Sequence, residues 1–350
     1  MKTTGNEHRR LFFSTLALLS VTWLAIPHAG QDGANDGFIL FTTDRDNPSD
    51  LGMCNPPKCE DIYVMAPDGT NPVRLTSGGG APTDPAAYNS GGADWSHSKK
   101  LIAFQSNRVN LSVPQIHLMN LDGTEQQLLV SVPGGAAFPS FSQSGNELCF
   151  HGQTAPRDIY IVNVHGTDLT NLTTPDRLPG QPGLNGDNIR CDWSAKGNAI
   201  AFTSSRDGNQ EIYVIDADGT GLHRMTTAGG SDANPAFSPK GDMIAFESNR
   251  DGTPEIYVMN ADGTGIQERL THFSAEPIPS NVSVSKPTWS PSGDRIAFHR
   301  RVGAQGVRGH LEVYTMNADG TNVTRITFTP SPGFSGFPSW GKWSADSVRQ

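Results

Sequence analysis

The sequence is poor in charged residues and has no excess of basic ones. Lys, Arg, Asp and Glu make up 17% of the 350 residues, and 26 basic against 35 acidic side chains give a formal net charge of −9. Because nucleic-acid-binding surfaces show as a basic excess, we expect no nucleic-acid partner. Gly (38) and Pro (25) are plentiful instead, which favours many short strands joined by tight turns over helices.

Local motifs of several enzyme and metal-binding classes are also missing. The sequence has no Gly-x-Ser-x-Gly elbow of an α/β-hydrolase, and its Gly-rich run at 77–80 is not followed by the Lys-Ser/Thr of a phosphate-binding loop. Its ten His form no local cluster, and His151 and His299 occupy equivalent positions in distant repeats. The Asp-Gly-Thr elements do not fit an EF-hand calcium loop. We therefore predict no catalytic residue, no metal and no cofactor.

The chain has one long uncharged run, and it lies near the N-terminus. Three basic residues precede the run at 11–26, and small residues follow it. This order is typical of a secretory signal peptide, and the run is shorter than the about 20 apolar residues of a membrane span. We expect a signal peptide at 1–30 and a linker at 31–36, with no stable membrane span after cleavage and a periplasmic or secreted location. Arg9-Arg10 fits either an ordinary basic region or a twin-arginine motif, which leaves the export pathway open.

The four cysteines suit an oxidising compartment. Cys54 and Cys59 lie in one Pro-rich insertion, and we predict that they form a disulfide that staples this loop. The alternative is half of a metal site, for which no second Cys pair and no nearby His is present. Cys149 and Cys191 fall in predicted strands of successive repeats, where they either pair or remain small buried residues.

A short cassette returns six times along the chain. Its two cleanest copies are AIAFTSSRDGNQEIYVIDADGTG (199–221) and MIAFESNRDGTPEIYVMNADGTG (243–265), offset by 44 residues. A period of 43 to 57 residues, filled with short apolar runs and turn residues, signals a propeller-type array. The Asp-Gly-Thr element, or His-Gly-Thr once, starts at Asp68, Asp122, His165, Asp218, Asp262 and Asp319.

Each copy is predicted to form four antiparallel strands. The first-strand aromatic precedes the second-strand Phe by nine residues in five copies, and such constant spacing indicates strands of fixed register. Asp-Gly between apolar strands is a strong hairpin signal. We predict an all-β fold, a six-bladed β-propeller of four-stranded antiparallel blades over 37–344, with 24 strands.

The two ends of the array are complementary. The first copy begins at its second strand (37–41), and the last copy continues into a spare first strand at 337–340. The C-terminal strand is therefore predicted to complete the first blade, which closes the ring and removes open sheet edges. Residues 345–350 remain as a C-terminal tail.

Basic and acidic residues recur at fixed places in the repeat. Arg45, Arg108, Arg206 and Arg250 lie four residues beyond the second-strand Phe. Acidic residues lie two before the third-strand Tyr, at Asp61, Asp158, Glu211, Glu255 and Glu312. We expect the two sets to form cross-strand ion pairs, the alternative being a basic ring that recognises an anionic partner.

This pattern resembles the TolB-like family of WD-repeat-like β-propeller proteins. The resemblance rests on strings of the type Ile-Ala-Phe, Ser-x-Arg-Asp-Gly, Glu-Ile-Tyr-Val-Met-Asn, Asp-Gly-Thr, Arg-Leu-Thr and Trp-Ser-Pro-x-Gly, which recur across 37–344. The resemblance is specific for the fold. It is much less specific for function, because the same blades occur in periplasmic adaptors, peptidase accessory domains and a few lyases. Only residues 31–36 separate the signal segment from the first strand, so we expect the N-terminal α/β domain of TolB to be absent.

The resemblance implies a binding function. We predict an exported, non-catalytic binding or adaptor protein, monomeric, that engages a protein or peptide partner of the cell envelope on one propeller face. The alternative is a propeller-type polysaccharide lyase or hydrolase with a metal at the channel mouth.

The connections between blades alternate in length. From the fourth-strand apolar residue to the next first-strand aromatic, the gaps are 20, 12, 21, 12, 19 and 14 residues. The three long connections (77–94, 174–192, 272–288) are predicted to form a binding rim at the channel mouth, the alternative being that long loops merely tolerate insertion. The predicted partner-binding residues are Arg190, Asn234 and Lys286, just before first-strand aromatics.

Overall fold

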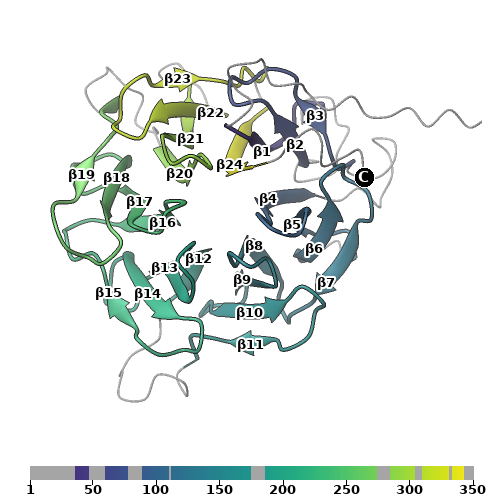
Figure 1. Ribbon diagram of the computed structural model, residues 1–350, viewed down its shortest axis with the longest axis horizontal. Helices are drawn as coiled ribbons and strands as arrows, with labels where there is room; N and C mark the ends of the chain where they lie inside the picture. The colour runs from purple at the N-terminus through teal and green to yellow at the C-terminus, as the bar shows by residue number, and fades with distance from the viewer. Residues whose placement is uncertain are drawn as a thin grey trace, which may run out of the picture.

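The computed structural model describes residues 36–46, 60–77, 89–109, 112–174, 186–273, 284–303, 310–330 and 333–342. In these residues 24 strands form six four-stranded antiparallel sheets, without any α-helix. The sheets stand as blades around a central channel, with the first strand of each blade innermost (Figure 1). The predicted six-bladed propeller is therefore confirmed. No described segment forms a helix long and apolar enough to cross a membrane.

The strands follow the repeat, with the innermost strand of each blade named first. Blade one contains β24 (Ser335–Gly341), β1 (Phe38–Thr43), β2 (Asp61–Met65) and β3 (Val73–Arg74); blade two contains β4 (Ser90–Trp95), β5 (Leu101–Ser106), β6 (Gln115–Asn120) and β7 (Gln127–Val130); blade three contains β8 (Ala136–Phe141), β9 (Glu147–Gly152), β10 (Ile159–Asn163) and β11 (Thr170–Asn171). Blade four contains β12 (Asn188–Trp193), β13 (Ala199–Ser204), β14 (Glu211–Asp216) and β15 (His223–Arg224); blade five contains β16 (Asp232–Phe237), β17 (Met243–Ser248), β18 (Glu255–Asn260) and β19 (Glu268–Arg269); blade six contains β20 (Val284–Trp289), β21 (Arg295–Val302), β22 (His310–Asn317) and β23 (Thr324–Arg325).

The C-terminal strand closes the ring as predicted. Strand β24 pairs antiparallel with β1, placing Trp340 opposite Ile39. The indole Nε1 of Trp95 in blade two donates to the carbonyl of Ser339 at 3.0 Å. A Cβ on Gly341 would lie 2.4 Å from the Trp95 ring, so glycine allows this aromatic to pack directly on the closing strand.

Aromatic and aliphatic side chains fill the space between blades. The second-strand Phe of every blade is fully buried, at Phe41, Phe104, Phe150, Phe202, Phe246 and Phe298. One core cluster joins Trp193 and Phe202 of blade four to Ile159 and Leu172 of blade three. Each such side chain contributes about 1.5–3 kcal/mol when it is fully buried, so adjacent blades stabilise each other.

A disulfide also joins blades three and four. Cys149 in β9 and Cys191 in β12 are bonded, with their Cα atoms 6.3 Å apart. The sequence left this pairing open. The bond closes a loop with a sequence separation of 42 residues, for which chain entropy predicts a stabilisation of about 4 kcal/mol.

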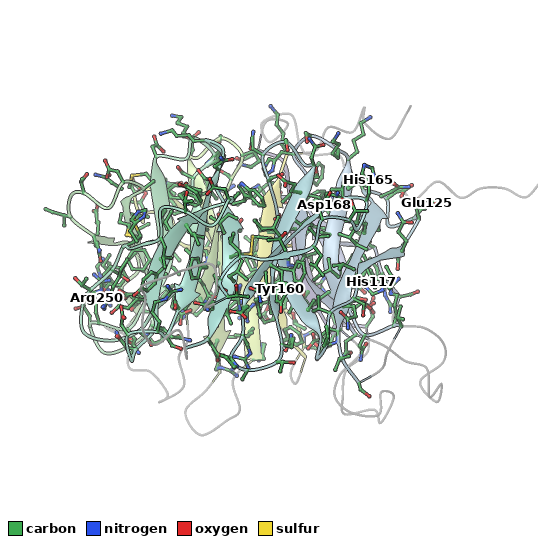
Figure 2. The ribbon with its side chains drawn as sticks, turned by 90° about the horizontal axis from the view of Figure 1, so that it is seen from below. His117, Glu125, Tyr160, His165, Asp168 and Arg250 are labelled. Atoms are coloured by element: carbon green, nitrogen blue, oxygen red, sulfur yellow. A yellow bond between two sulfur atoms is a disulfide. The ribbon has the colours of Figure 1, made fainter. Side chains whose placement is uncertain are left out.

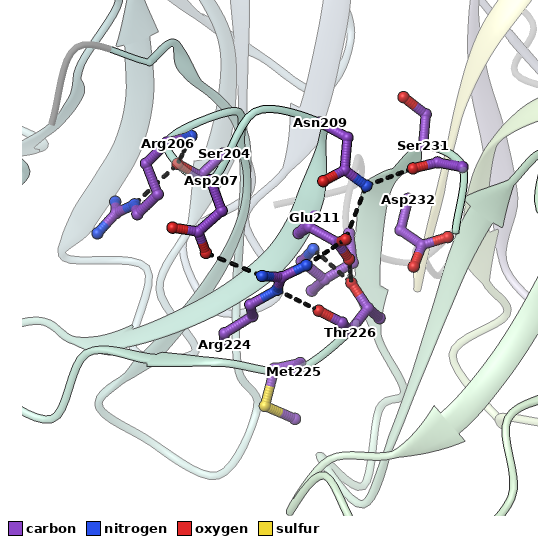
Figure 3. Close-up of polar contacts among 12 residues, drawn as sticks. Ser204, Arg206, Asp207, Asn209, Glu211, Arg224, Met225, Thr226, Ser231 and Asp232 are labelled. Carbon is purple, nitrogen blue, oxygen red and sulfur yellow. Dashed lines mark hydrogen bonds and ion pairs between the residues drawn. The ribbon is translucent and has the colours of Figure 1, made fainter. Parts of the chain in front are cut away.

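The third-strand acids are bound by the fourth strand. The buried carboxylate of Glu211 accepts hydrogen bonds from the guanidinium of Arg224 and from the Thr226 hydroxyl, the latter at 2.6 Å (Figure 3). The same Thr226 hydroxyl accepts the Ile212 N–H at 2.9 Å. Equivalent acid, Arg and Thr sets are Asp61–Arg74–Thr76, Glu255–Arg269–Thr271 and Glu312–Arg325–Thr327.

The predicted pairing of these acids with second-strand arginines is therefore wrong for Arg206 and Arg250. Arg206 donates instead to Ser204 and Asn188, and Arg250 pairs with Asp232 at 2.8 Å. Both side chains turn inward to the first strand of their own blade and lie over the second- and third-strand aromatic rings. The fourth-strand Arg lies opposite the third-strand Tyr in the register. Because the acid lies only two residues before that Tyr, the Arg side chain reaches it.

The blade connections define two faces of the propeller. We call the face with the first-to-second-strand turns and the Asp-Gly-Thr hairpins the turn face, and the opposite one the connection face. His165 and Asp168 lie at the turn face and Arg250 lies toward the connection face (Figure 2). At a representative hairpin, Asp218 accepts from the backbone N–H and hydroxyl of Thr220 at 2.9 and 2.7 Å, so the repeated element is a hairpin turn as predicted.

Candidate binding site in the central channel

Two cavities lie along the central channel. The smaller one, of about 90 Å³, is lined by all six innermost strands, including Arg190, Asn234 and Lys286. The larger one, of about 240 Å³, extends to the first-to-second-strand turns and is lined by His97 and Lys342 among others. The three residues predicted to bind a partner are thus brought together, from three different blades, at one level of the channel.

Six equivalent residues form what we call the channel ring. Each innermost strand contains a β-bulge at this level. The residue three before the first-strand aromatic has a left-handed backbone, and all six such residues line the smaller cavity. They are Gly92 (φ 55°), Phe138 (52°), Arg190 (59°), Asn234 (54°), Lys286 (58°) and Phe337 (54°).

The ring conformation is costly for the residues that adopt it. A positive φ is uncommon for residues other than Gly, and each such residue costs of order 1–3 kcal/mol that the surrounding structure must offset. Pro follows the ring residue in four blades, at Pro139, Pro235, Pro287 and Pro338. Because Pro has no N–H, it is confined to edge strands and bulges, as on these channel-facing strands.

The preceding blade supplies the bonds that hold the ring. The N–H of Arg190 donates to His151 Nδ1 at 3.2 Å, and the N–H of Phe337 donates to His299 Nδ1 at 3.1 Å. Burial lowers the pKa of both imidazoles, that of His299 to about 3, so each stays neutral and free to accept. Gln105, Thr203 and Thr42 accept from three of the other ring residues, Phe138, Asn234 and Gly92.

The equivalence of His151 and His299 in the sequence therefore reflects a positioning role. Each follows the fully buried Phe of its second strand and bonds the ring residue of the next blade. The two histidines lie in blades three and six, in distant repeats as the sequence indicated. Among the described residues, no group of three or more His, Cys, Asp or Glu is placed to hold a metal ion.

Two cationic side chains share one aromatic ring in the smaller cavity. The guanidinium carbon of Arg190 lies 3.2 Å from the ring centroid of Phe138, and Lys286 Nζ lies 4.5 Å from the same centroid. Burial lowers the pKa of Arg190 to about 9. Burial and the nearby Arg190 charge lower the pKa of Lys286. Phe337 packs on Phe138 with centroids 5.5 Å apart.

Asn234 is held by a partly buried acid of its own blade. Its amide Nδ2 donates to Glu247 at 2.6 Å and to Ser285 at 3.1 Å. Burial raises the pKa of Glu247, and hydrogen bonds from Ser285 and Asn234 oppose that shift. The Asn234 side chain is therefore fixed at the cavity wall by its neighbours.

Two further acids lie beside the ring, in the layer shared with the larger cavity. Asp192 accepts from the Phe237 N–H at 2.7 Å and from the Ser140 hydroxyl at 3.2 Å. Asp94 likewise accepts from the Phe141 N–H and the Ser339 hydroxyl, both at 2.9 Å. Burial raises the pKa of both carboxyls, that of Asp192 to about 7. Asp94 thereby joins blade two to blades one and three, and Asp192 joins blade four to blades three and five.

Sequence reasoning located three of the six members of the ring and missed Gly92, Phe138 and Phe337. Arg190, Asn234 and Lys286 were chosen for their spacing from the first-strand aromatics, a spacing that Phe138 and Phe337 share. The missed signal is the Pro after the ring position in blades one, three, five and six. Cys54, Cys59, residues 1–35 and most of the three long connections lie outside the described residues, so the staple, the signal peptide and the rim remain predictions.

Comparison with known proteins finds similarity to TolB propellers over part of the chain. Residues 181–307 match the family model described as TolB beta propeller domain. The protein TolB homolog of Chlorobium luteolum is 31% identical over 136 residues, which cover 39% of this chain and 28% of that protein. The match therefore spans little more than a quarter of this curated relative.

Two solved structures share the architecture. TolB from Acinetobacter baumannii superimposes with a TM-score of 0.67 and 22% identity, covering 89% of this chain and 68% of that one. A putative TolB from Agrobacterium tumefaciens gives a TM-score of 0.57 and 19% identity, covering 86% and 97%. At these identities the similarity establishes the fold alone.

Proposed function

We propose that this chain, a six-bladed β-propeller that is similar in part to TolB propellers, is an exported, non-catalytic binding protein that holds a protein or peptide partner at its central channel. Arg190, Asn234 and Lys286 are the residues that we assign to this contact. The partner approaches from the connection face, where the three long connections were predicted to form a rim. The function is proposed for this chain and is not transferred from the curated relative, because the match covers only part of that protein.

The observation that carries the proposal is the channel ring. Five of its six members are not Gly, although the left-handed backbone favours Gly. Costly backbone geometry concentrates at functional sites, where the strain is part of how side chains are positioned. Here it aims large side chains into a shared cavity rather than into the core.

The chemistry of the ring suits recognition of a polypeptide. Arg and aromatic residues are enriched at protein interfaces, and they dominate the contacts whose loss weakens binding most. The ring supplies Arg190 together with Phe138 and Phe337, and these side chains contact one another. An arriving segment would therefore meet a cationic and aromatic surface already held in place.

Export is supported by the disulfide as well as by the N-terminal sequence. The bond between Cys149 and Cys191 is of a kind that persists in the periplasm and outside the cell and is rare in the cytosol. We propose a periplasmic or secreted location on this basis.

Site-specific photo-cross-linking in the native host tests the proposal. Phe337 is replaced with the photo-cross-linking residue p-benzoylphenylalanine, which keeps an aromatic ring at the cavity. The matched control carries the same residue at Ile266, which is 91% exposed and lies beyond the Asp262 hairpin, away from the channel. We expect a discrete protein adduct from position 337 and none of the same mass from position 266.

Two outcomes would contradict the proposal. One is an adduct of the same mass from position 266 alone, which would place the partner on the outer surface. The other is turnover of acidic oligosaccharides by purified protein together with a stoichiometric metal, which would support the polysaccharide lyase alternative. We expect neither.

A further inference from the structure

Arg190 and Lys286 are the two cationic residues among those that line the smaller cavity. Neither side chain forms a hydrogen bond or an ion pair with any described residue, and the Nη1 atom of Arg190 is buried without a partner. Both side chains line the smaller cavity. By contrast, the arginines of the acid, Arg and Thr sets are paired with carboxylates, as Arg224 is with Glu211.

The two cations are also close to each other. Both lie over the Phe138 ring, so their separation is at most the sum of their 3.2 and 4.5 Å distances to its centroid. The charge of Arg190 lowers the pKa of Lys286. Two like charges that are partly withdrawn from water repel each other, and an anion between them would relieve the repulsion.

None of the neighbouring acids is the anion that would lie between Arg190 and Lys286. Glu247 is bonded to Asn234 and Ser285. Asp192 and Asp94 are each bonded to a backbone N–H and a serine hydroxyl of adjoining blades. None of the three lies within ion-pairing distance of Arg190 or Lys286. The three acids thus form their hydrogen bonds with the channel wall. Against the lowering by burial, the charge of Glu247 raises the pKa of both cations and that of Asp192 raises the pKa of Lys286, but none of these acids bonds directly to either cation.

The dimensions and lining of the cavity favour a carboxylate. Its volume of about 90 Å³ is below the about 150 Å³ of a cavity that binds benzene, which leaves room for one small anionic group. A guanidinium binds the two oxygens of a carboxylate in a matching planar geometry. Phe138 and Phe337 offer an apolar surface to the hydrocarbon stem that a carboxylate carries and that an inorganic anion lacks.

We propose that Arg190 and Lys286 form a carboxylate-binding site within the channel ring. The carboxylate comes either from a polypeptide, as a chain terminus or an acidic side chain, or from a free small acid. The inference rests on the proposed function in that it names the group by which the channel recognises its partner. It requires no covalent step.

Titration of Lys286 by NMR tests the site directly in the purified, full protein. The chain has eight lysines, so lysine labelled with ¹³C at Cε gives a short spectrum in which Lys286→Arg assigns the resonance. Because a bound carboxylate favours the charged ammonium, the pKa of Lys286 should rise when sodium acetate or N-acetyl-glycyl-glycine is added. N-acetyl-glycyl-glycine amide, which lacks the carboxylate, and sodium sulfate serve as control ligands.

The two carboxylate probes distinguish the sources. A larger rise with N-acetyl-glycyl-glycine than with acetate assigns the site to a polypeptide carboxylate, and an equal rise assigns it to small acids. The proposal is overturned if neither probe moves the Lys286 resonance. It is equally overturned if sulfate or the amide moves that resonance as far as the carboxylates do, since the site would then not select a carboxylate.

Two variants separate ligand binding from structural effects. Arg190→Gln should raise the pKa of Lys286 in the free protein, because the like charge is gone, and should weaken acetate binding about tenfold. Lys342→Gln removes a cation from the other channel cavity and should leave both quantities unchanged. An unchanged acetate affinity in Arg190→Gln would remove Arg190 from the site. Because these readouts need no partner, they can fail while the cross-link at Phe337 succeeds, and the reverse also holds.

Discussion

Replacing Thr226 with Val should destabilise the propeller far more than the same replacement at Thr220. The Thr226 hydroxyl is buried and makes two bonds, one from the Ile212 N–H at 2.9 Å and one to the Glu211 carboxylate at 2.6 Å. Valine has nearly the same shape and removes both. The Thr220 hydroxyl bonds Asp218 at the exposed end of a hairpin.

The size of the effect follows from the two lost bonds. A buried donor left without a partner costs about 1–3 kcal/mol, and a hydrogen bond to a charged group contributes about 1.5–3 kcal/mol. The additional buried methyl group returns about 0.8 kcal/mol. We therefore expect Thr226→Val to lower the free energy of unfolding by about 3 kcal/mol, and Thr220→Val by less than about 1 kcal/mol because its bond is exposed to water.

Urea unfolding followed by tryptophan fluorescence measures both variants beside the native protein. A loss of stability appears as a lower midpoint with an unchanged slope. In the double variant with Glu211→Gln, the two losses should not add, since the residues share one network. Equal midpoints for Thr226→Val and Thr220→Val would refute the view that the acid, Arg and Thr set stabilises the blade.

Three further predictions concern the channel and the blade contacts. Burial raises the pKa of Asp192 to about 7 in the folded protein, above its unfolded value of about 3.9. This carboxyl therefore makes the protein less stable as pH rises through that interval. The Asp192→Asn variant should lack that loss, so its stability relative to the native protein should be greater at pH 8 than at pH 4 in denaturant titrations. An advantage that grows toward low pH would contradict this assignment. Replacing both Cys149 and Cys191 with Ser should lower the free energy of unfolding by about 2–5 kcal/mol. Because the variant no longer has this disulfide, a reductant should not remove its contribution to stability a second time. An unchanged melting temperature of the variant would argue against the bond. His299→Leu should leave the Phe337 N–H without its acceptor and lower stability by about 1–3 kcal/mol, with His299→Gln, which retains an acceptor, recovering part of the loss in the same assay.

The fold was predictable because its determinants are local and repeated. Asp-Gly hairpins, second-strand Phe residues and third-strand Tyr residues recur at fixed spacings, and each lies within a single blade. Closure was also predictable, since the first copy lacks the strand that follows the last copy. Strand β24 pairs with β1 as this complementarity requires.

The partners of the charged residues were less accessible to sequence reasoning. Arg206 and Arg224 both lie within reach of Glu211 along the chain, and the choice between them depends on which way each side chain turns. Arg224 lies on the adjacent fourth strand, opposite Tyr213. Arg206 is drawn inward to Asn188 and over the ring of Tyr213. Such orientation is set by three-dimensional packing rather than by spacing.

The channel ring illustrates the same limit. Spacing alone placed Arg190, Asn234 and Lys286 together. It gave no sign that all six equivalent residues adopt a left-handed backbone, because Phe, Lys and Arg do not favour that conformation. Five of the six residues are held by bonds from the preceding blade, such as the one from the Phe337 N–H to His299, and those contacts exist only once neighbouring blades have packed together.

The central claim is that the channel ring binds the partner, and affinity measured with the partner identified by cross-linking tests it most directly. Isothermal titration would compare the native protein with the triple variant Arg190→Gln, Asn234→Ala, Lys286→Gln, and with Ile266→Ala as a surface control. We predict that the triple variant binds at least about tenfold more weakly, a loss of about 1.4 kcal/mol or more, while the control binds as the native protein does. A folded triple variant that binds with native affinity would contradict the account.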